Sequence, residues 1–184
     1  MSNIRILYSQ EEIQKRVKEL GEEITRAYTG KVPHLVCILR GAVIFLSDLI
    51  RYINLPLTID FMAVSSYGRG TKSSGVVKII KDLDESIENR DVLIVEDIID
   101  TGLTLEHLTK IFKARNPRDL KVCVLLDKEA RRVVNINVDF VGFKVPDEFI
   151  IGYGLDYNGL YRNLPFLGIL DNLEFGGESF EKTV

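Results

Sequence analysis

With 184 residues, the chain is long enough for one compact domain with a substantial core and is marginal for two. Hydrophobic residues make up 46% of it and charged residues 28%, a globular composition that excludes a disordered or fibrous protein. The net charge of −3 argues against a nucleic-acid partner, which would require a basic surface. No apolar run reaches the roughly 18 residues of a membrane span, so we expect no membrane partner either.

The first third of the chain has the pattern of a helix, a buried strand and a second helix. Apolar residues recur at helical spacing over residues 9–28, and Ser9 and Glu12 have the spacing of a capping box. The continuous apolar run at 34–39 predicts a buried strand. Residues 42–52 are expected to form a mostly buried helix.

The rest of the chain alternates strands with one further helix. We predict this helix at 103–115 and strands at 57–64, 76–81, 92–95, 121–126, 138–143, 149–153 and 166–170. Strands that alternate with helices predict an α/β fold with a twisted, mainly parallel sheet covered on both faces, and ligands that bind beyond the carboxyl ends of the strands. We expect a single domain over 1–184, with the last strands and the N-terminal helix forming a small hood, and a long mobile loop over the small, polar residues 65–75.

Cysteine and histidine usage points to an intracellular protein without a metal cluster of its own. Cys37 and Cys123 each lie within an apolar run, so we predict buried thiols in a cytoplasmic protein, neither disulfide-bonded nor catalytic. The short, mixed N-terminal segment does not resemble a secretory signal. We expect His34 and His107 at the surface, because neither has a ligand partner at metal-binding spacing.

The most informative stretch is V-L-I-V-E-D-I-I-D-T-G-L-T, from Val92 to Thr104. A buried strand ends in two acids, and a short turn then opens a helix. Backbone N–H groups, the hydroxyls of Thr101 and Thr104 and the positive end of the helix dipole meet at this turn, which predicts a phosphate cradle. Gly102 allows the backbone to approach the anion closely.

Glu96 and Asp97 would repel a phosphate, so we expect them to face ribose hydroxyls or a Mg²⁺ ion with its waters. Taken singly, these acids and Asp100 could simply end a strand or cap a helix. The whole order, four apolar residues, two acids, two apolar residues and D-T-G-x-T, resembles the phosphoribosylpyrophosphate-binding signature of type I phosphoribosyltransferases. The chain has neither G-x-x-x-x-G-K-[ST] nor a complete dinucleotide fingerprint, which disfavours an ATPase or an NAD-binding protein.

Four further segments make residues 4–170 similar to the bacterial hypoxanthine (hypoxanthine-guanine) phosphoribosyltransferases. They are L-R-G-A from Leu39, S-S-Y-G from Ser65, L-L-D-K ending at Lys128, and P-D-E-F-I-I-G-Y-G-L-D-Y from Pro146. The resemblance implies the type I phosphoribosyltransferase fold. It also implies transfer of the phosphoribosyl group of 5-phosphoribosyl-1-pyrophosphate (PRPP) to hypoxanthine or guanine, giving IMP or GMP and pyrophosphate in purine salvage. Mg²⁺ as cofactor and a homodimer or homotetramer are implied as well.

The resemblance also assigns roles to individual residues. PRPP, through its 5′-phosphate and ribose, would bind Glu96, Asp97, Asp100, Thr101, Gly102, Leu103 and Thr104. Pyrophosphate would bind Leu39, Arg40, Gly41 and Arg162, with a cis peptide bond between Leu39 and Arg40, and Mg²⁺ would bind Glu96, Asp97 and Asp156. The purine would bind Lys128, Phe149 and Ile150, and Ser66 and Tyr67 would belong to a mobile lid. Arg40 stands where many relatives have Lys, and Ala42 where many have Gly, which we expect the site to tolerate.

Three of these roles have a clear chemical basis. The ammonium of Lys128 would donate to a 6-oxo purine, whereas the 6-amino group of adenine would face it with a second donor and leave a polar group unpaired. Phe149 would stack on the purine, and Asp100 would act as general acid or base near N7. Without the resemblance, a solvated Lys128 and a core Phe149 would be the simpler interpretations.

Three alternatives remain open. The first is a phosphoribosyltransferase for another base, and the second is a fold relative that kept the ribose-phosphate site in order to regulate through RNA. The third and most distant is a non-enzymatic interaction protein, which the intact Glu96, Asp97 and Asp100 disfavour. The net charge of −3 argues against the second alternative. Lys128 and Phe149 together argue for a purine pocket.

Overall fold

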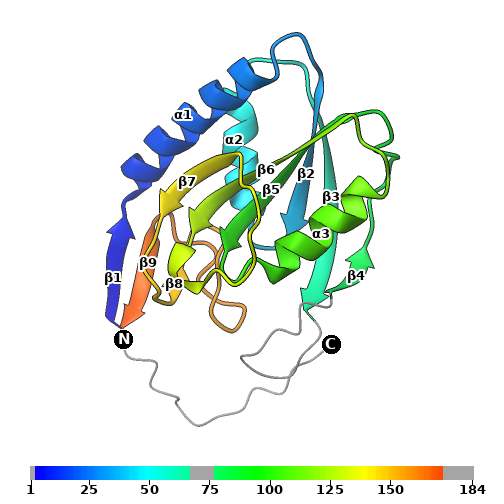
Figure 1. The fold of residues 1–184 in the computed structure, drawn as a ribbon. Helices are drawn as coiled ribbons and strands as arrows, with labels where there is room; N and C mark the ends of the chain where they lie inside the picture. The colour runs from blue at the N-terminus through cyan, green and yellow to red at the C-terminus, as the bar shows by residue number, and fades with distance from the viewer. Residues whose placement is uncertain (1–2, 67–76, 172–184) are drawn as a thin grey trace.

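The computed structural model describes residues 3–66 and 77–171, which form a six-stranded sheet between helices and a smaller sheet beside it (Figure 1). The strand order of the large sheet is β4 (Val77–Lys81), β3 (Thr58–Ser66), β2 (Pro33–Leu39), β5 (Asp91–Ile99), β6 (Asp119–Asp127) and β7 (Phe140–Lys144). All neighbours are parallel except β4, which runs antiparallel to β3. The predicted α/β fold with a mainly parallel sheet is thus confirmed.

Helices cover both faces of this sheet. One hydrophobic cluster packs α1 (Gln10–Ala27) and α2 (Val43–Leu49) on one face, and a second packs α3 (Leu103–Lys113) on the other (Figure 1). Successive β5 residues alternate between them: Leu93 belongs to the first cluster and Ile94 to the second. The predicted capping box of α1 is present, since Glu12 N donates to Ser9 Oγ and Ser9 N donates to Glu12 Oε2. No helix of the described part of the chain is long and apolar enough to span a membrane.

The hood is a three-stranded antiparallel sheet in the order β1 (Asn3–Tyr8), β9 (Leu167–Asp171) and β8 (Ile150–Ile151). Terminal segments do form it, as expected, but the expected contribution of the N-terminal helix is wrong. The first strand, which the sequence pattern did not reveal, takes that place, while α1 packs against α2 and β7 of the main body.

Several other boundaries also differ from the predictions, two of them near the site. The helix expected over 42–52 is divided into α2 and a 3-10 helix, η1 (Ile50–Tyr52). The loop expected over 65–75 begins later, because Ser65 and Ser66 pair with β4 as the end of β3. The rest of that loop lies outside the described residues.

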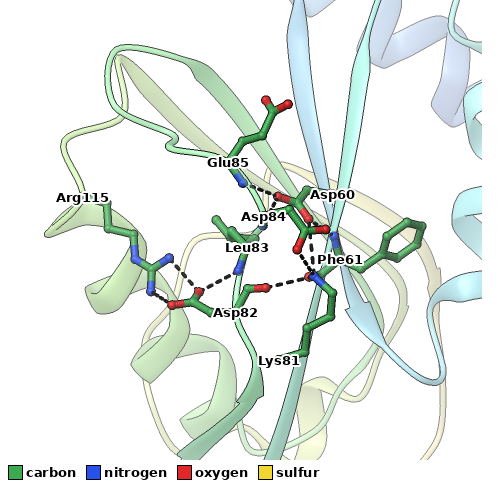
Figure 2. A network of polar contacts seen from close by, with 8 residues as sticks. All are labelled: Asp60, Phe61, Lys81, Asp82, Leu83, Asp84, Glu85 and Arg115. Atoms are coloured by element: carbon green, nitrogen blue, oxygen red, sulfur yellow. Dashed lines mark hydrogen bonds and ion pairs between the residues drawn. The ribbon is translucent and has the colours of Figure 1, made fainter.

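A polar network holds the edge strand β4 and the turn that follows it against the rest of the sheet (Figure 2). The buried carboxylate of Asp60 on β3 accepts from the backbone N of Asp84 at 2.8 Å and lies 3.8 Å from Nζ of Lys81. Arg115, just after α3, donates to both carboxylate oxygens of Asp82 at 2.8 and 2.9 Å. These contacts tie the far end of α3 to the edge of the sheet.

Both cysteines are free and buried, as predicted, and burial raises the pKa of each thiol. The expectation of a surface His34 is wrong, because this side chain is only 1% exposed. Its Nδ1 lies 2.7 Å from Oγ1 of Thr58 and 3.1 Å from Nη1 of Arg90. Since a guanidinium can only donate, Nδ1 is the acceptor, and the proton of the neutral ring is on Nε2.

Acidification is expected to destabilise the protein through His34. Burial, with a further contribution from the charge of Arg90, lowers the pKa of this imidazole below its ordinary 6.5. The unfolded chain therefore binds this proton more readily than the folded protein, so His34 stabilises the fold above about pH 6.5 and this contribution is lost as the pH falls. Urea titrations between pH 5.5 and 7.5 should show a smaller pH dependence of the unfolding free energy for His34→Asn. The same pH dependence in both proteins would contradict this assignment.

Candidate active site

The expected phosphate turn joins the end of β5 to the start of α3. Gly102, the N-cap of α3, has φ 85° and ψ −9°, a left-handed conformation that glycine adopts without strain. The first helical hydrogen bond runs from Glu106 N to Gly102 O at 2.8 Å, so the preceding N–H groups have no partner within the helix. An open cavity of about 140 Å³ adjoins the turn and is lined by Glu96, Ile98, Ile99, Asp100, Thr101, Gly102, Thr104 and Leu105.

The segment after β6 supports this turn from behind. Lys128 N donates to Ile99 O, and Val133 N donates to Thr101 O, both at 3.0 Å. Arg132, held by the carboxylate of Asp127 at 2.5 Å, donates from Nε to the carbonyl of Asp100 at 3.4 Å. The turn is therefore fixed by backbone and side-chain contacts before any ligand arrives.

A second support is the close approach of Gly102 to the same segment. A Cβ atom at Gly102 would lie 2.9 Å from side-chain atoms of both Arg132 and Val134. Glycine is thus required here by space as well as by backbone conformation. The sequence motifs did not identify Arg131 and Arg132 as site residues. The signal that could have done so is their position, because they follow Lys128 by only three and four residues.

Glu96 and Asp97 are consecutive residues in the second half of β5, in an environment that disfavours two negative charges. Burial, reinforced by the charge of Asp97, raises the pKa of Glu96 well above its ordinary value. Burial also raises the pKa of Asp97, and the nearby Asp156 adds to the increase while Arg162 opposes it. A cation or a set of hydroxyl donors placed here would stabilise the charged forms.

The donor set fits a Mg²⁺ ion that takes most of its ligands from substrate oxygens and water. Mg²⁺ is commonly held by one or two carboxylates together with substrate phosphates, and Asp97 and Asp156 offer such carboxylates. Asp156 is paired with Arg162 at 2.6 Å. Within residues 3–66 and 77–171, no three His, Cys, Asp or Glu side chains are grouped so as to hold an ion by themselves.

The expected pyrophosphate loop lies against these acids. The peptide bond between Leu39 and Arg40 is cis, as the resemblance implied. A Cβ atom on Gly41 would overlap the carboxylate of Asp97, and one on Gly154 would overlap the carbonyl oxygen of Gly41. Arg162 donates to the carbonyl of Gly154 at 2.6 Å. The structure therefore gathers the residues assigned to pyrophosphate and two of the three assigned to Mg²⁺ at one place, namely Leu39, Arg40, Gly41, Asp97, Asp156 and Arg162.

Gly41→Ala is expected to weaken PRPP binding, because the added methyl group must displace either the loop or the Asp97 carboxylate. A displacement of about 1 Å in a positioning element can cost roughly 10²-fold in rate, so we expect kcat/KM for PRPP to fall by about 10- to 100-fold. Steady-state kinetics with varied PRPP would measure the change, and a thermal melt would establish that the variant is folded. A folded variant with unchanged kcat/KM would show that the loop does not contact PRPP.

Of the three residues assigned to the purine, Phe149 is partly exposed, whereas Lys128 and Ile150 are buried. Lys128 is 7% exposed, so the alternative of a solvated lysine is wrong. Phe149 is 41% exposed, so it is not a core residue, and it meets Tyr157 edge-on with ring centroids 5.6 Å apart. Ile150 is buried in the hood strand β8. A partly exposed aromatic residue and a buried lysine are thus both present.

Asp100 has one carboxylate oxygen engaged and one without a partner. Oδ2 lies 3.3 Å from Nη1 of Arg131. Oδ1 is buried and has no hydrogen-bond partner in the described part of the chain. Of the two lid residues, Ser66 ends β3 opposite Val77, and Tyr67 lies outside the described residues.

Known proteins resemble this chain over most of its length. The model of the phosphoribosyl transferase domain matches residues 4–158. A hypoxanthine-guanine phosphoribosyltransferase of Bacillus subtilis is 55% identical over 166 residues, covering 90% of this chain and 92% of the relative. A hypoxanthine phosphoribosyltransferase of Buchnera aphidicola is 55% identical over 167 residues, covering 90% and 94%.

Solved structures show the same fold. The crystal structure of a hypoxanthine phosphoribosyltransferase from Staphylococcus aureus has a TM-score of 0.88 and 52% identity, with 91% of each chain covered. That of a hypoxanthine-guanine phosphoribosyltransferase from Bacillus anthracis, with a HEPES molecule in its active site, has a TM-score of 0.89 and 45% identity, covering 93% of this chain and all of the other. The protein has the type I phosphoribosyltransferase fold and belongs to the phosphoribosyl transferase family.

Proposed function

We propose that the protein transfers the 5-phosphoribosyl group of PRPP to hypoxanthine and guanine, giving IMP or GMP and pyrophosphate. The observation that carries this proposal is the position of Lys128. Its backbone N is bonded to Ile99 at the phosphate turn, and its side chain is buried. The ammonium of Lys128 would then serve as the donor for a 6-oxo purine, next to the site proposed for the 5′-phosphate. The names of the two sequence relatives support the same substrates.

The charged groups are distributed as this reaction requires. Breaking the bond between C1′ and pyrophosphate leaves positive charge on the ribose and negative charge on the leaving group. Arg40 and Arg162 would stabilise the leaving group, and Glu96 or Asp97 would stabilise the ribose. A Mg²⁺ ion held with Asp97 and Asp156 would neutralise further charge on pyrophosphate when bound.

Asp100 would handle the proton of the purine. As N9 attacks C1′, a proton must leave the ring, and a carboxylate near N7 is suited to receive it. The carboxylate of Asp100, which lines the cavity beside the turn, would be the group that takes this proton. Phe149, with its exposed ring, would stack on the base meanwhile.

Steady-state assays with hypoxanthine, guanine, xanthine and adenine test the proposed specificity. We expect turnover with PRPP and Mg²⁺ for the 6-oxo purines hypoxanthine and guanine and at most weak turnover for adenine, because its amino group would leave the buried Lys128 without an acceptor. Addition of EDTA should abolish turnover, and excess Mg²⁺ should restore it. Efficient use of adenine, or full activity in EDTA, would contradict the proposal.

Location and assembly remain predictions. Two buried, free cysteines are typical of a cytoplasmic protein, where thiols stay reduced. We expect a homodimer or homotetramer, which size-exclusion chromatography with light scattering would measure. A purely monomeric protein at micromolar concentration would contradict that expectation.

A further inference from the structure

Arg131 lies between the phosphate turn and the loop that leads to Phe149. It is the last residue of η2 (Glu129–Arg131), the 3-10 helix that follows Lys128. Its Nη1 is 3.3 Å from Oδ2 of Asp100, and its Nε is 3.6 Å from Oδ1 of Asp147. One guanidinium therefore contacts two carboxylates. The first, Asp100, is proposed to exchange a proton with the purine, and the second, Asp147, belongs to the loop that leads to Phe149.

These ion pairs are poorly placed to stabilise the fold. The side chain of Arg131 is 45% exposed, and those of Asp100 and Asp147 are 40% and 53% exposed. Ion pairs so accessible to water contribute little to stability. A guanidinium, however, presents several donors in one rigid plane and can fix the orientation of two carboxylates at once. The contacts of Arg131 are thus better suited to orienting its partners than to holding the protein together.

The two oxygens of Asp100 have different surroundings. Arg131 is near Oδ2, whereas Oδ1 is buried without a hydrogen-bond partner in the described residues. The backbone of Asp100 is held separately, through the donation of Arg132 Nε to its carbonyl. With the backbone fixed, the remaining freedom is rotation of the carboxylate, and within residues 3–66 and 77–171 Arg131 is the ion-pair partner that restricts it.

We propose that Arg131 is a positioning residue for Asp100. It holds Oδ2 and so fixes the orientation of the carboxylate that lines the cavity, and Asp147 in turn holds Arg131. This inference rests on the proposed function, in which Asp100 exchanges a proton with the base. It assigns no contact with substrate to Arg131 and no additional chemical step.

The test is a double-mutant cycle of Arg131→Gln and Asp100→Asn, with kcat and KM measured for hypoxanthine and PRPP. Misplacing a reacting group by about 1 Å can cost roughly 10²-fold, so we expect Arg131→Gln alone to lower kcat by about 10- to 100-fold. KM for PRPP should change less than kcat, because the phosphate turn keeps its own supports. In the Asp100→Asn background, Arg131→Gln should cause no further loss, since groups that act as a unit are not additive.

Two further variants and one control make the result specific. Arg131→Lys should recover part of kcat, because an ammonium can pair with Asp100 but lacks the planar fork. Asp147→Asn should lower kcat less than Arg131→Gln does, with KM for PRPP unchanged. Arg51→Gln, at an exposed arginine in η1, is the matched control and should retain wild-type kinetics.

The outcomes separate this inference from the function on which it rests. If the wild-type protein is active and Arg131→Gln has the same kcat, this inference is overturned while the proposed function stands. An equal loss in the wild-type and Asp100→Asn backgrounds would also overturn it, because Arg131 would then act independently of Asp100. A wild-type protein that transfers no phosphoribosyl group to any purine would overturn the proposed function first and this inference with it. Should Arg131→Gln fail to fold, Arg131→Lys and Asp147→Asn provide the same comparison.

Discussion

Replacement of Asp100 by Asn is expected to lower kcat by about 10²–10⁴-fold, the usual contribution of a general acid or base. The amide is nearly the same size as the carboxylate but cannot accept the purine proton. Binding of PRPP should change little, because the turn is supported by the bonds of Ile99 and Thr101 to the segment after β6. A loss in kcat with a modest change in KM is therefore the expected pattern.

Glu22→Gln is the matched control for this carboxylate-to-amide change, since Glu22 is exposed on α1, away from the turn. Glu22→Gln should have the same kcat and KM as the wild-type protein. Single-turnover measurements would show whether the chemical step itself is slowed. Near-normal single-turnover rates for Asp100→Asn would remove Asp100 from the proposed role.

Lys128→Met should change the choice of base more than the stability of the protein. The side chain is buried, so an apolar replacement of similar length is accommodated, but the donor for the 6-oxo group is lost. An unpaired buried polar group costs about 1–3 kcal/mol, roughly 5- to 150-fold in kcat/KM. We expect kcat/KM to decrease by this factor for hypoxanthine and guanine, whereas kcat/KM for adenine should not decrease.

The ratio of kcat/KM for hypoxanthine and adenine is the quantity to compare between Lys128→Met and wild type. Lys113→Met, at an exposed lysine near the end of α3, is the matched control and should preserve the ratio. A Lys128→Met variant that discriminates against adenine as strongly as the wild type does would show that the ammonium does not recognise the 6-oxo group.

The parallel core was predictable from sequence because its strands are buried on both faces. Such strands consist of continuous apolar runs, as at Val92 to Val95, and the helices between them have regular amphipathic spacing. The site turn was predictable for a different reason, because its acids, hydroxyls and glycine occur in one continuous segment. Local sequence was sufficient for both features.

The features that sequence did not reveal depend on contacts between distant segments. The strand β1 forms only by pairing with β9, some 160 residues away, and its mixed composition has no period of its own. Similarly, β5 continues to Ile99 because its polar end keeps pairing with β6 as far as Asp127. His34 is buried because Thr58 and Arg90 bond to it from other parts of the chain.

The same distinction holds within the candidate site. Arg131 received no role from the sequence, because its relation to Asp100 and Asp147 appears only once η2 lies beside the turn. The adjacency of Gly41 to Asp97 likewise depends on β2 and β5 being neighbours in the sheet. The motifs predicted which residue types the site contains. They could not predict which segments of the chain contact one another in the folded protein.

A crystal structure of the protein with IMP and Mg²⁺ tests the central claim most directly. The account predicts the 5′-phosphate on the backbone N–H groups of the turn from Asp100 to Thr104, with the ribose hydroxyls facing Glu96 and Asp97 and the 6-oxo group near Lys128. A nucleotide bound elsewhere, with that turn empty, would contradict it.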